Sequence, residues 1–393
     1  MSTKLYNKDV DIKEITIAEF DAMDGEHVFS KEYEQKKQSI LDAFKSQGLK
    51  KQKNKVKRVA VAAALIVIPA TVYAASTHTQ FFDNMFGNST KKNMESYDQE
   101  LENGSGDGTV TVTVPSKEYV SVDSETAETL IGEQVSDEPI VKQLGDHTLT
   151  VESVVYDKHA AMVSFILERE GGVTMLDGDA LTNQTKGAYF SNEAEYFFGV
   201  FGEKNGNGGD GCIYIDFERS TSEKLYCYQY VLLRTLQENE GIVLNITHFP
   251  STMESLNNMT EEELSAFEEK TTEESVLLSN KEKVSAVEFV SEEGGCLEVS
   301  PISLVVDMAK GLGLSYSPDG EEYSEASDPI WMKKMELQYK DGSSYLVEDQ
   351  DNYVDNTGYV CQFDTLYSVA FNRLVDTEEI ECIMVNGVKY TRK

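Results

Sequence analysis

The sequence predicts a mainly β protein: two extracytoplasmic antiparallel β-sandwich-like units after a single transmembrane helix, with a short α-helical cytoplasmic N-terminus. Three patterns lead to this architecture. Residues 59–76 form an uncharged apolar run directly after a basic cluster. Residues 1–58 repeat apolar side chains at helical intervals, and residues from 146 onward alternate with a period of two, as half-buried strands do.

The apolar run is long enough to cross the hydrocarbon core of a bilayer. Residues 59–75 read VAVAAALIVIPATVYAA, and a helix of that length spans about 25 Å, near the lower limit for a membrane-spanning helix. Two other interpretations are a buried core helix and a cleaved signal peptide ending at Val72-Tyr73-Ala74. The long helical segment before the run favours an uncleaved helix, so membrane lipid is an expected partner of residues 59–76.

The charge distribution predicts the orientation of this helix. A basic flank on one side only indicates a cytoplasmic N-terminus and an extracellular C-terminal region in the cell membrane. Residues 1–58 carry 13 basic and 10 acidic side chains, whereas the rest of the chain carries 22 and 59. Such an acidic surface repels nucleic acid, so we expect no nucleic-acid partner. The topology-determining residues are Lys50, Lys51, Lys53, Lys55, Lys57 and Arg58.

The predicted cytoplasmic segment, residues 1–58, reads as two short amphipathic helices. Thr16 to Glu19 has the capping-box pattern, and Ser30 is a favourable N-cap for a second helix. Helices this short bury little surface alone, so their apolar faces require each other, the membrane surface or another protein, unless they form a marginal hairpin without a partner. The candidate partner-binding residues are Phe20, Tyr33, Ile40, Leu41 and Phe44.

Residues 77–145 are expected to form a juxtamembrane linker with a short helix at 124–130. The Gly-rich stretch at 103–108 is typical of a flexible connection, and Val110 to Val114 alternates as a strand does. The apolar cluster just after the membrane segment is expected at the membrane interface. Its members are Phe81, Phe82, Met85 and Phe86.

Two β domains are predicted beyond this linker, at 146–250 and 283–393, joined by an acidic connection at 251–282. The first has strand patterns at 147–156, 161–167, 195–201, 212–217, 225–233 and 242–248. The connection contains a second capping box, Thr260 to Glu263, and so a short helix. The second has strand patterns at 284–290, 296–308, 331–339, 345–348, 359–363, 369–374 and 380–390, with hairpin signals at Asp341-Gly342 and Asn386-Gly387.

The sequence contains no recognisable catalytic motif. Its five histidines are scattered, no serine lies in a strand-to-helix elbow, and no phosphate-binding glycine loop follows a strand. The five cysteines lack metal-ligand spacing, although one or two disulfides stay open. Acidic and Gly-rich loops at 205–211 and 348–355 resemble calcium loops in composition but not in ligand spacing. We therefore assign no catalytic, metal-binding or cofactor-binding residue and no cofactor, and expect a protein that is not an enzyme.

Several short segments resemble a family of single-pass membrane proteins of gut Firmicutes that carry an extracytoplasmic domain of unknown function. These segments are Met85–Asn88, Pro115–Val120, Leu130–Gly132, Ser136–Pro139, Gly145–Thr150, Ala180–Asn183, Lys186–Ser191, Ser220–Tyr228, Ser300–Leu304, Phe371–Asp376 and Val385–Gly387. Members of that family are often described as anti-sigma factors, because many are encoded beside an extracytoplasmic-function sigma factor.

The resemblance implies signal transduction by an anti-sigma-factor-like regulator. Its cytoplasmic helices would bind a sigma factor in the manner of a helix in a groove, and its outer β region would sense an envelope or ligand signal. The zinc motif of many anti-sigma factors is missing, since His27 has no cysteine near it in residues 1–58. The alternative is a surface-displayed, non-catalytic binding or structural module held by an uncleaved signal-anchor. The extracellular ligand is unknown.

Overall fold

The computed structural model describes residues 81–83, 85–102, 109–122, 124–136, 138–177, 187–204, 209–252, 255, 259–308, 332–363 and 366–393. All of them belong to one compact unit of the chain, Pro69–Lys393. The predicted cytoplasmic segment, its partner-binding residues, the basic cluster and the predicted helix at 59–76 lie outside the described residues. Among the helices that are described, none has the length and hydropathy needed to span a bilayer.

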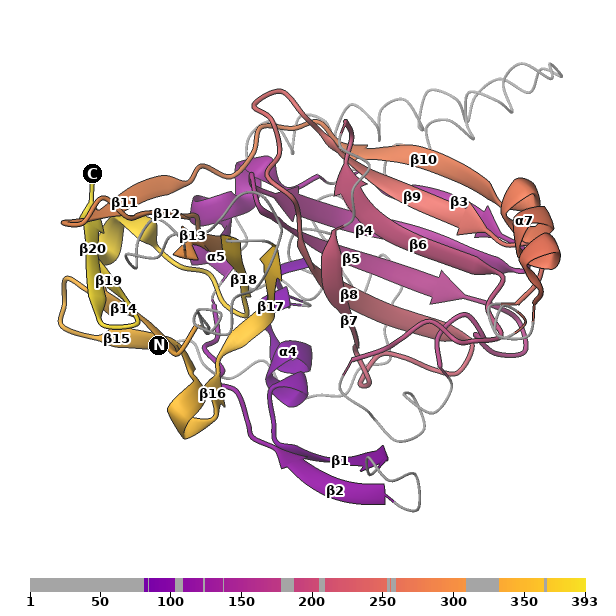
Figure 1. The fold of residues 1–393 in the computed structure, drawn as a ribbon, viewed down its shortest axis with the longest axis horizontal. Helices are drawn as coiled ribbons and strands as arrows, with labels where there is room; N and C mark the ends of the chain where they lie inside the picture. Colours follow the sequence, from indigo (N-terminus) through magenta and orange to yellow (C-terminus); the bar gives the residue numbers. More distant parts are fainter. Residues whose placement is uncertain are drawn as a thin grey trace, which may run out of the picture. The chain divides into compact units, whose positions relative to one another are not determined.

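The mainly β, antiparallel prediction is confirmed (Figure 1). Two sheets make up the first β region: a five-stranded sheet in the order β3-β4-β5-β8-β7 and a three-stranded sheet in the order β10-β9-β6. Their strands are β3 (Ile140–Leu144), β4 (His147–Tyr156), β5 (Ala160–Glu168), β6 (Tyr196–Gly202), β7 (Asp210–Ile215), β8 (Lys224–Leu232), β9 (Ile242–His248) and β10 (Thr272–Ser279).

A shared apolar core holds these two sheets together. Alternate residues of the strands, such as Leu149, Phe165 and Val231 in the larger sheet and Leu244 in the smaller, are buried in one cluster. Phe165 and Phe198 meet edge to face with ring centroids 5.3 Å apart. The period-two pattern of the sequence thus places one face of each sheet in this core.

The second β region is one ten-stranded sheet in the order β16-β15-β14-β19-β20-β11-β12-β13-β18-β17. Its strands are β11 (Val287–Ser291), β12 (Cys296–Val299), β13 (Ser303–Asp307), β14 (Lys334–Tyr339), β15 (Ser344–Asp349), β16 (Val354–Asp355), β17 (Thr357–Phe363), β18 (Leu366–Phe371), β19 (Ile380–Val385) and β20 (Val388–Arg392). Short 3-10 helices occur at η4 (Gln350–Asn352) and η5 (Thr377–Glu379).

This sheet curls into a near-barrel, because its two edge strands follow each other in the chain. Only Asn356 separates β16 from β17, and its carbonyl accepts a hydrogen bond of 2.5 Å from the Tyr345 hydroxyl of β15. The Tyr367 hydroxyl of β18 donates to the Glu348 carboxylate of β15, which joins the two ends of the strand order. The predicted sandwich is therefore replaced here by a single curved sheet around its own core.

The two strongest hairpin signals lie at turns, as predicted. Asn386 and Gly387, between β19 and β20, have φ values of 49° and 86°, the left-handed pair that an Asn-Gly turn adopts. Gly342, between β14 and β15, has φ 85°. The strand predicted at 296–308 is in fact β12 and β13, because Pro301 cannot donate to a ladder and a turn forms there.

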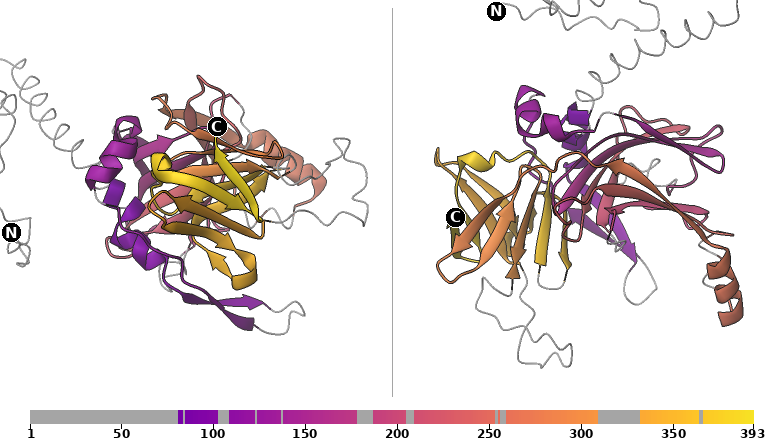
Figure 2. Two further views of the ribbon diagram at one scale, coloured as in Figure 1. Left: turned by 90° about the vertical axis from the view of Figure 1, so that its left-hand side faces the viewer. Right: turned by 90° about the horizontal axis from the view of Figure 1, so that it is seen from above.

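Helical segments cover the outer face of the five-stranded sheet. They comprise helical residues at 81–83 and 85–86, α4 (Asn88–Asn93), α5 (Ser124–Ile131) and the 3-10 helix η2 (Gly132–Gln134). Figure 2 shows them as the purple helices. Helix α7 (Glu261–Lys270) begins at Thr260, whose side chain and that of Glu263 form the predicted capping box. A two-stranded hairpin, β1 (Tyr97–Glu102) and β2 (Thr109–Val114), pairs with no other described strand.

The expectation that Phe81, Phe82, Met85 and Phe86 lie at a membrane interface is wrong. Their side chains are almost fully buried in a protein core that also contains Tyr214, Tyr228, Tyr230, Ile302 and Ala370. The five-stranded sheet offers these side chains an apolar face that the sequence pattern of the segment alone does not reveal.

Candidate functional site

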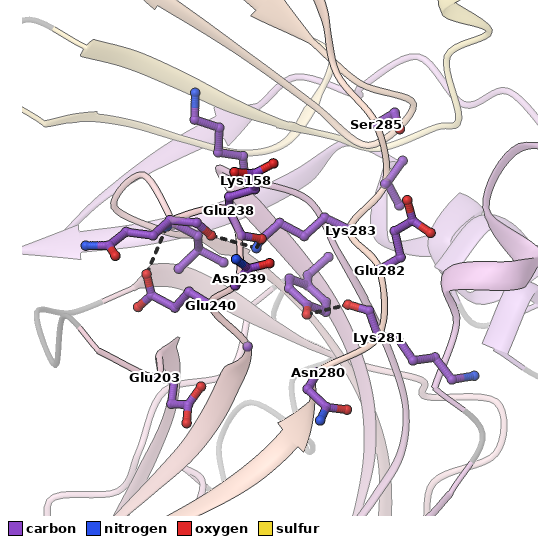
Figure 3. Close-up of a pocket in the computed structure, with 15 residues that line it drawn as sticks. Lys158, Glu203, Glu238, Asn239, Glu240, Asn280, Lys281, Glu282, Lys283 and Ser285 are labelled. Carbon is purple, nitrogen blue, oxygen red and sulfur yellow. Dashed lines mark hydrogen bonds between the residues drawn. The ribbon is translucent and has the colours of Figure 1, made fainter.

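A cavity of about 900 Å³ opens beside the end of the five-stranded sheet (Figure 3). Three chain segments line it: the end of β4 with the turn after it, at Tyr156 and Lys158; the loop before β9, at 236–241; and the segment after β10, at 280–285. Glu203, directly after β6, completes the wall. The cavity is therefore built from segments that lie far apart in the sequence.

The lysines of the cavity are already engaged. The Lys283 ammonium donates to the carbonyls of Gln237 and Glu238, at 2.7 and 2.8 Å, and burial lowers its pKa. Lys281 donates through Nζ to the carbonyl of Val135 at 2.6 Å. These bonds fasten residues 281–283 to the loop before β9 and to the end of the η2 segment, so both lysines serve the shape of the wall.

One acidic residue of the cavity has a structural role. Glu240 is buried, and its two carboxylate oxygens accept backbone N–H bonds from Lys204 at 2.8 Å and Gln237 at 2.9 Å. In contrast, Glu203, Glu238 and Glu282 are exposed at the cavity. The accessible groups are thus mainly carboxylates and amides, which suit hydrogen-bond donors in a polar ligand.

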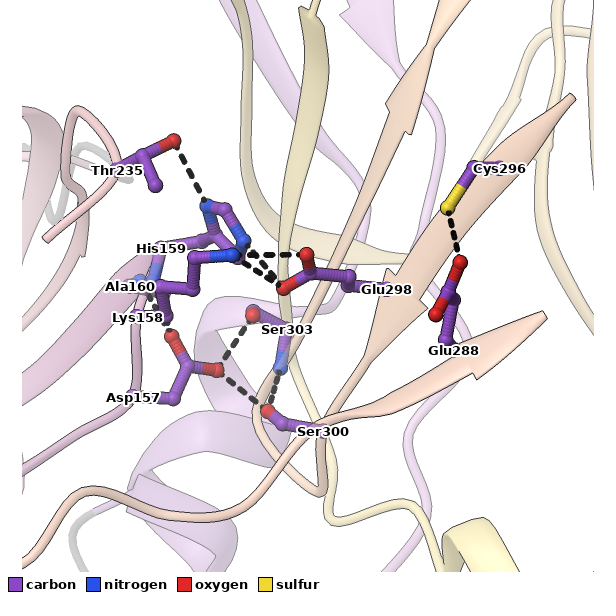
Figure 4. A network of polar contacts seen from close by, with 10 residues as sticks. All are labelled: Asp157, Lys158, His159, Ala160, Thr235, Glu288, Cys296, Glu298, Ser300 and Ser303. Atoms are coloured by element: carbon purple, nitrogen blue, oxygen red, sulfur yellow. Dashed lines mark hydrogen bonds and ion pairs between the residues drawn. The ribbon is translucent and has the colours of Figure 1, made fainter. Parts of the chain in front are cut away.

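A buried carboxylate lies next to the cavity, at the turn between β4 and β5 (Figure 4). Asp157 is 0% exposed. Its Oδ1 accepts from the backbone N–H groups of His159 and Ala160, at 2.6 and 2.7 Å. Its Oδ2 accepts from the hydroxyls of Ser300 and Ser303, both at 2.5 Å. Four donors compensate the cost of burying this charge and tie the first β region to the turn between β12 and β13.

A second carboxylate continues this polar network. Glu298 of β12 accepts from Lys158 Nζ at 2.8 Å and lies 3.1 Å from His159 Nε2. The hydrogen bond with His159 and the ion pair with Lys158 lower the pKa of Glu298 to about 2. The other ring nitrogen of His159 faces the Thr235 hydroxyl at 3.5 Å. Since Lys158 also lines the cavity, the cavity wall and the network share a residue.

The network does not have the arrangement of a nucleophilic site. The hydroxyls of Ser300 and Ser303 are buried and donate to Asp157, and Ser300 also accepts from the backbone N–H groups of Ile302 and Ser303 at 3.0 Å. The histidine of the network faces Glu298 and not a serine. A nucleophile requires a base within hydrogen-bond reach and access for the substrate. The hydrogen bonds of the network therefore hold Ser300, Ser303 and His159 in position.

A second contact between the β regions lies on the aromatic face of the five-stranded sheet. The Tyr214 hydroxyl donates to the carbonyl of Gly358 in β17 at 3.0 Å. A side chain at Gly358 would place its Cβ 2.8 Å from the Tyr230 ring, so the backbone of β17 packs directly against that ring. Segment 81–94, described except for residue 84, covers the same aromatic face.

Sequence reasoning did not identify these groups as a site. The predicted partner-binding residues lie outside the described part of the chain, as does the predicted membrane segment. Asp157, His159 and Glu298 gave no motif because their contacts join residues about 140 positions apart. One available signal was Ser300 to Leu304, a segment that also carries the family resemblance. The calcium-like acids at 349 and 355 instead form ion pairs with Lys334 and Lys117, and the described residues contain no metal-binding group of three or more ligands.

Comparisons with known proteins give no family. No family model matches the chain, and no curated protein matches it. Among solved structures, the chain is similar to the crystal structure of a conserved domain protein from Bacillus anthracis. The two are 11% identical with a TM-score of 0.33, over 64% of this chain and 77% of the other. A likeness at that level supports no inference about fold or function.

Proposed function

We propose that the chain is a membrane-anchored regulator resembling anti-sigma factors. Its N-terminal helices bind a cytoplasmic sigma factor, and its outer β region binds a polar signal molecule that changes the affinity of these helices for the sigma factor. One observation carries the proposal: the apolar side chains of a segment that begins five residues after the predicted membrane helix at 59–76 are buried in the core of the β region, namely Phe81, Phe82, Met85 and Phe86.

Burial of this segment supports coupling between the β region and the chain that precedes it. Each fully buried Phe or Met side chain contributes about 1.5–3 kcal/mol, and Phe81, Met85 and Phe86 are all buried here. The segment therefore cannot move independently of the sheets it contacts. A rearrangement of those sheets would displace the chain at residue 81, five residues after the end of the predicted membrane helix.

The cavity supports the proposal through one shared residue. Val284 lines the cavity, and it belongs to the same core cluster as Phe81 and Phe86. Its backbone N–H donates to the carbonyl of Tyr156 at 2.9 Å, across the cavity wall. A ligand that shifts residues 281–285 would thus disturb the packing around segment 81–94. Coupling of this kind needs a ligand that binds two arrangements with different affinity.

The test is co-purification of the full-length chain with the product of a neighbouring sigma-factor gene. We expect Phe44→Asp to abolish the complex, because it places a charge in the apolar stripe of the predicted second helix. Gln35→Asp, on the opposite side of that helix by sequence, is the matched control and should leave the complex intact. If neither variant affects binding and deletion of the gene leaves the regulon unchanged, the alternative of a surface-displayed binding module is favoured.

A further inference from the structure

The hairpin of β1 and β2 forms a two-stranded sheet of its own among the described strands (Figure 1), and β2 is exposed over five of its six residues. Its strands pair over six positions, from Tyr97 opposite Val114 to Glu102 opposite Thr109. The Thr113 hydroxyl donates to Asp98 at 2.7 Å across the pair. Val110 and Val112 are 51% and 43% exposed, which is unusual for the apolar side of a strand pair.

The outer edge of β2 is open to another strand. Alternate residues of an antiparallel strand direct their N–H and C=O groups away from the partner, and no described strand other than β1 pairs with β2. Its sequence, TVTVTV, has high β propensity and contains no charge, proline or glycine. Exposed edges are usually protected by such residues. The edge of β2 lacks that protection.

Charge determines which strand this edge fits. Residues 97–114 contain four acidic residues and no Lys or Arg, and three of the acids are in β1. The whole chain beyond residue 58 carries 59 acidic and 22 basic residues. A second copy would bring the same negative charge to the edge, whereas a basic strand is attracted to it.

We propose that β2 binds an extended basic segment of another protein by strand addition. The partner strand carries Lys or Arg at alternate positions and apolar residues at the others. Its backbone pairs with the free edge of β2, its apolar side chains cover Val110 and Val112, and its cations lie on the face of the hairpin that carries Asp98. This site is independent of the cavity and of the proposed sigma-factor contact.

The test uses the full-length chain in a non-ionic detergent and two fluorescent hexapeptides of equal composition. One alternates lysine and valine, and the other has three lysines followed by three valines. We expect the alternating peptide to bind at least about tenfold more tightly, because only its pattern separates the cations from the apolar face. Val112→Pro should lower that affinity by about tenfold or more, since proline disrupts strand pairing, and Val112→Thr should preserve it.

A charge variant keeps the backbone of the hairpin intact. Asp98→Lys should weaken binding of the alternating peptide by about twofold, because Asp98 of β1 lies two strand spacings, about 10 Å, from the added strand, and addition of salt should weaken binding further. Three results would overturn the proposal. If the two peptides bind with equal affinity, binding depends on charge attraction and not on strand pairing with β2. If neither peptide binds at about 1 mM, the edge of β2 is not a binding site for a basic strand. Sedimentation that reveals self-association, lost in Val112→Pro, would make a second copy the occupant.

Discussion

Segment 81–94 and the hairpin at 97–114 are neighbours in the sequence with opposite environments. Phe86 is 0% exposed in a core shared by both β regions, whereas Val110 and Val112 remain about half exposed. Both stretches were expected in one juxtamembrane linker, and both contain regularly spaced apolar residues. The apolar content of the two segments is similar, but their burial differs. Burial of a segment therefore depends mainly on whether the rest of the fold provides an apolar surface for it to pack against.

The surface that receives segment 81–94 consists of three tyrosines, which we call the tyrosine platform: Tyr214, Tyr228 and Tyr230. The first two rings stack with centroids 5.3 Å apart, and Tyr230 meets Tyr214 edge to face at 5.8 Å. Asn93 Nδ2 donates to the Tyr228 hydroxyl at 2.7 Å. The platform therefore holds the segment by apolar contact and by a buried hydrogen bond, and the hairpin has no counterpart to it.

The largest effect is expected from high pH. Burial raises the pKa of all three platform tyrosines above the ordinary value of 10.0. Their contribution to stability is therefore intact below pH 10 and is lost as the pH rises above it, because the unfolded state releases these protons first. Each such tyrosine lowers the free energy of unfolding by about 1.4 kcal/mol for each pH unit above pH 10, so the three platform tyrosines together lower it by about 4 kcal/mol per pH unit. Near-ultraviolet circular dichroism and tyrosinate absorbance measure this.

A single substitution serves as the control for this pH dependence. Tyr214→Phe removes one ionisable platform group and should make the slope of stability against pH above pH 10 shallower by about 1.4 kcal/mol per pH unit. Ionisation of all 20 tyrosines near pH 10 with the fold retained would contradict the buried platform.

The next largest effect is expected from Phe86→Ala. Removal of this fully buried ring leaves a cavity against the tyrosine platform, and such changes cost about 3–5 kcal/mol. Denaturant unfolding of the full-length chain measures the loss. Val112→Ala in the hairpin is the matched control and should change the free energy by less than about 0.5 kcal/mol. Equal losses in the two variants would remove the distinction between the segments.

Much of the fold was predictable because strand periodicity is local. The strand expected at 242–248 is β9, and the Asn386-Gly387 turn was read from two residues. Strand β10 was missed because its first residues, Thr272 to Ser275, are polar and exposed, as an edge strand allows. Strand β3 was missed because Pro139 stands directly before it. Such edge positions obey weaker sequence constraints than central ones.

The site was less predictable than the fold. The four donors of Asp157 come from two adjacent backbone groups and from two serines 143 and 146 positions away. Contacts between residues so far apart in the sequence leave no motif of closely spaced residues that could predict them. For the same reason, the apolar residues of segment 81–94 matched a membrane interface as well as a protein core, and the choice depended on tyrosines in β7 and β8.

A smaller effect is expected from Tyr228→Phe. The change keeps the ring on the platform but removes the acceptor of the Asn93 hydrogen bond, while Asn93 Nδ2 keeps its bond of 3.2 Å to the carbonyl of Ile215. The hydroxyl also hydrogen-bonds to the Thr90 side chain, and each buried hydrogen bond that is lost costs about 1–3 kcal/mol. Thermal unfolding of the variant measures it. Asn93→Ala in the Tyr228→Phe background should then cost less than in the native chain, and additive losses would contradict a direct contact.

The smallest effect is expected in the hairpin. Val112→Thr keeps a β-branched side chain on an exposed strand, so it should change the free energy of unfolding by less than about 0.5 kcal/mol. Amide hydrogen exchange sharpens the comparison. The N–H groups of β2 should exchange much faster than those of β8, which is paired on both sides and covered by segment 81–94. Slow exchange throughout β2 would mean that a strand already covers its edge in the full-length chain, and a basic strand should then displace it.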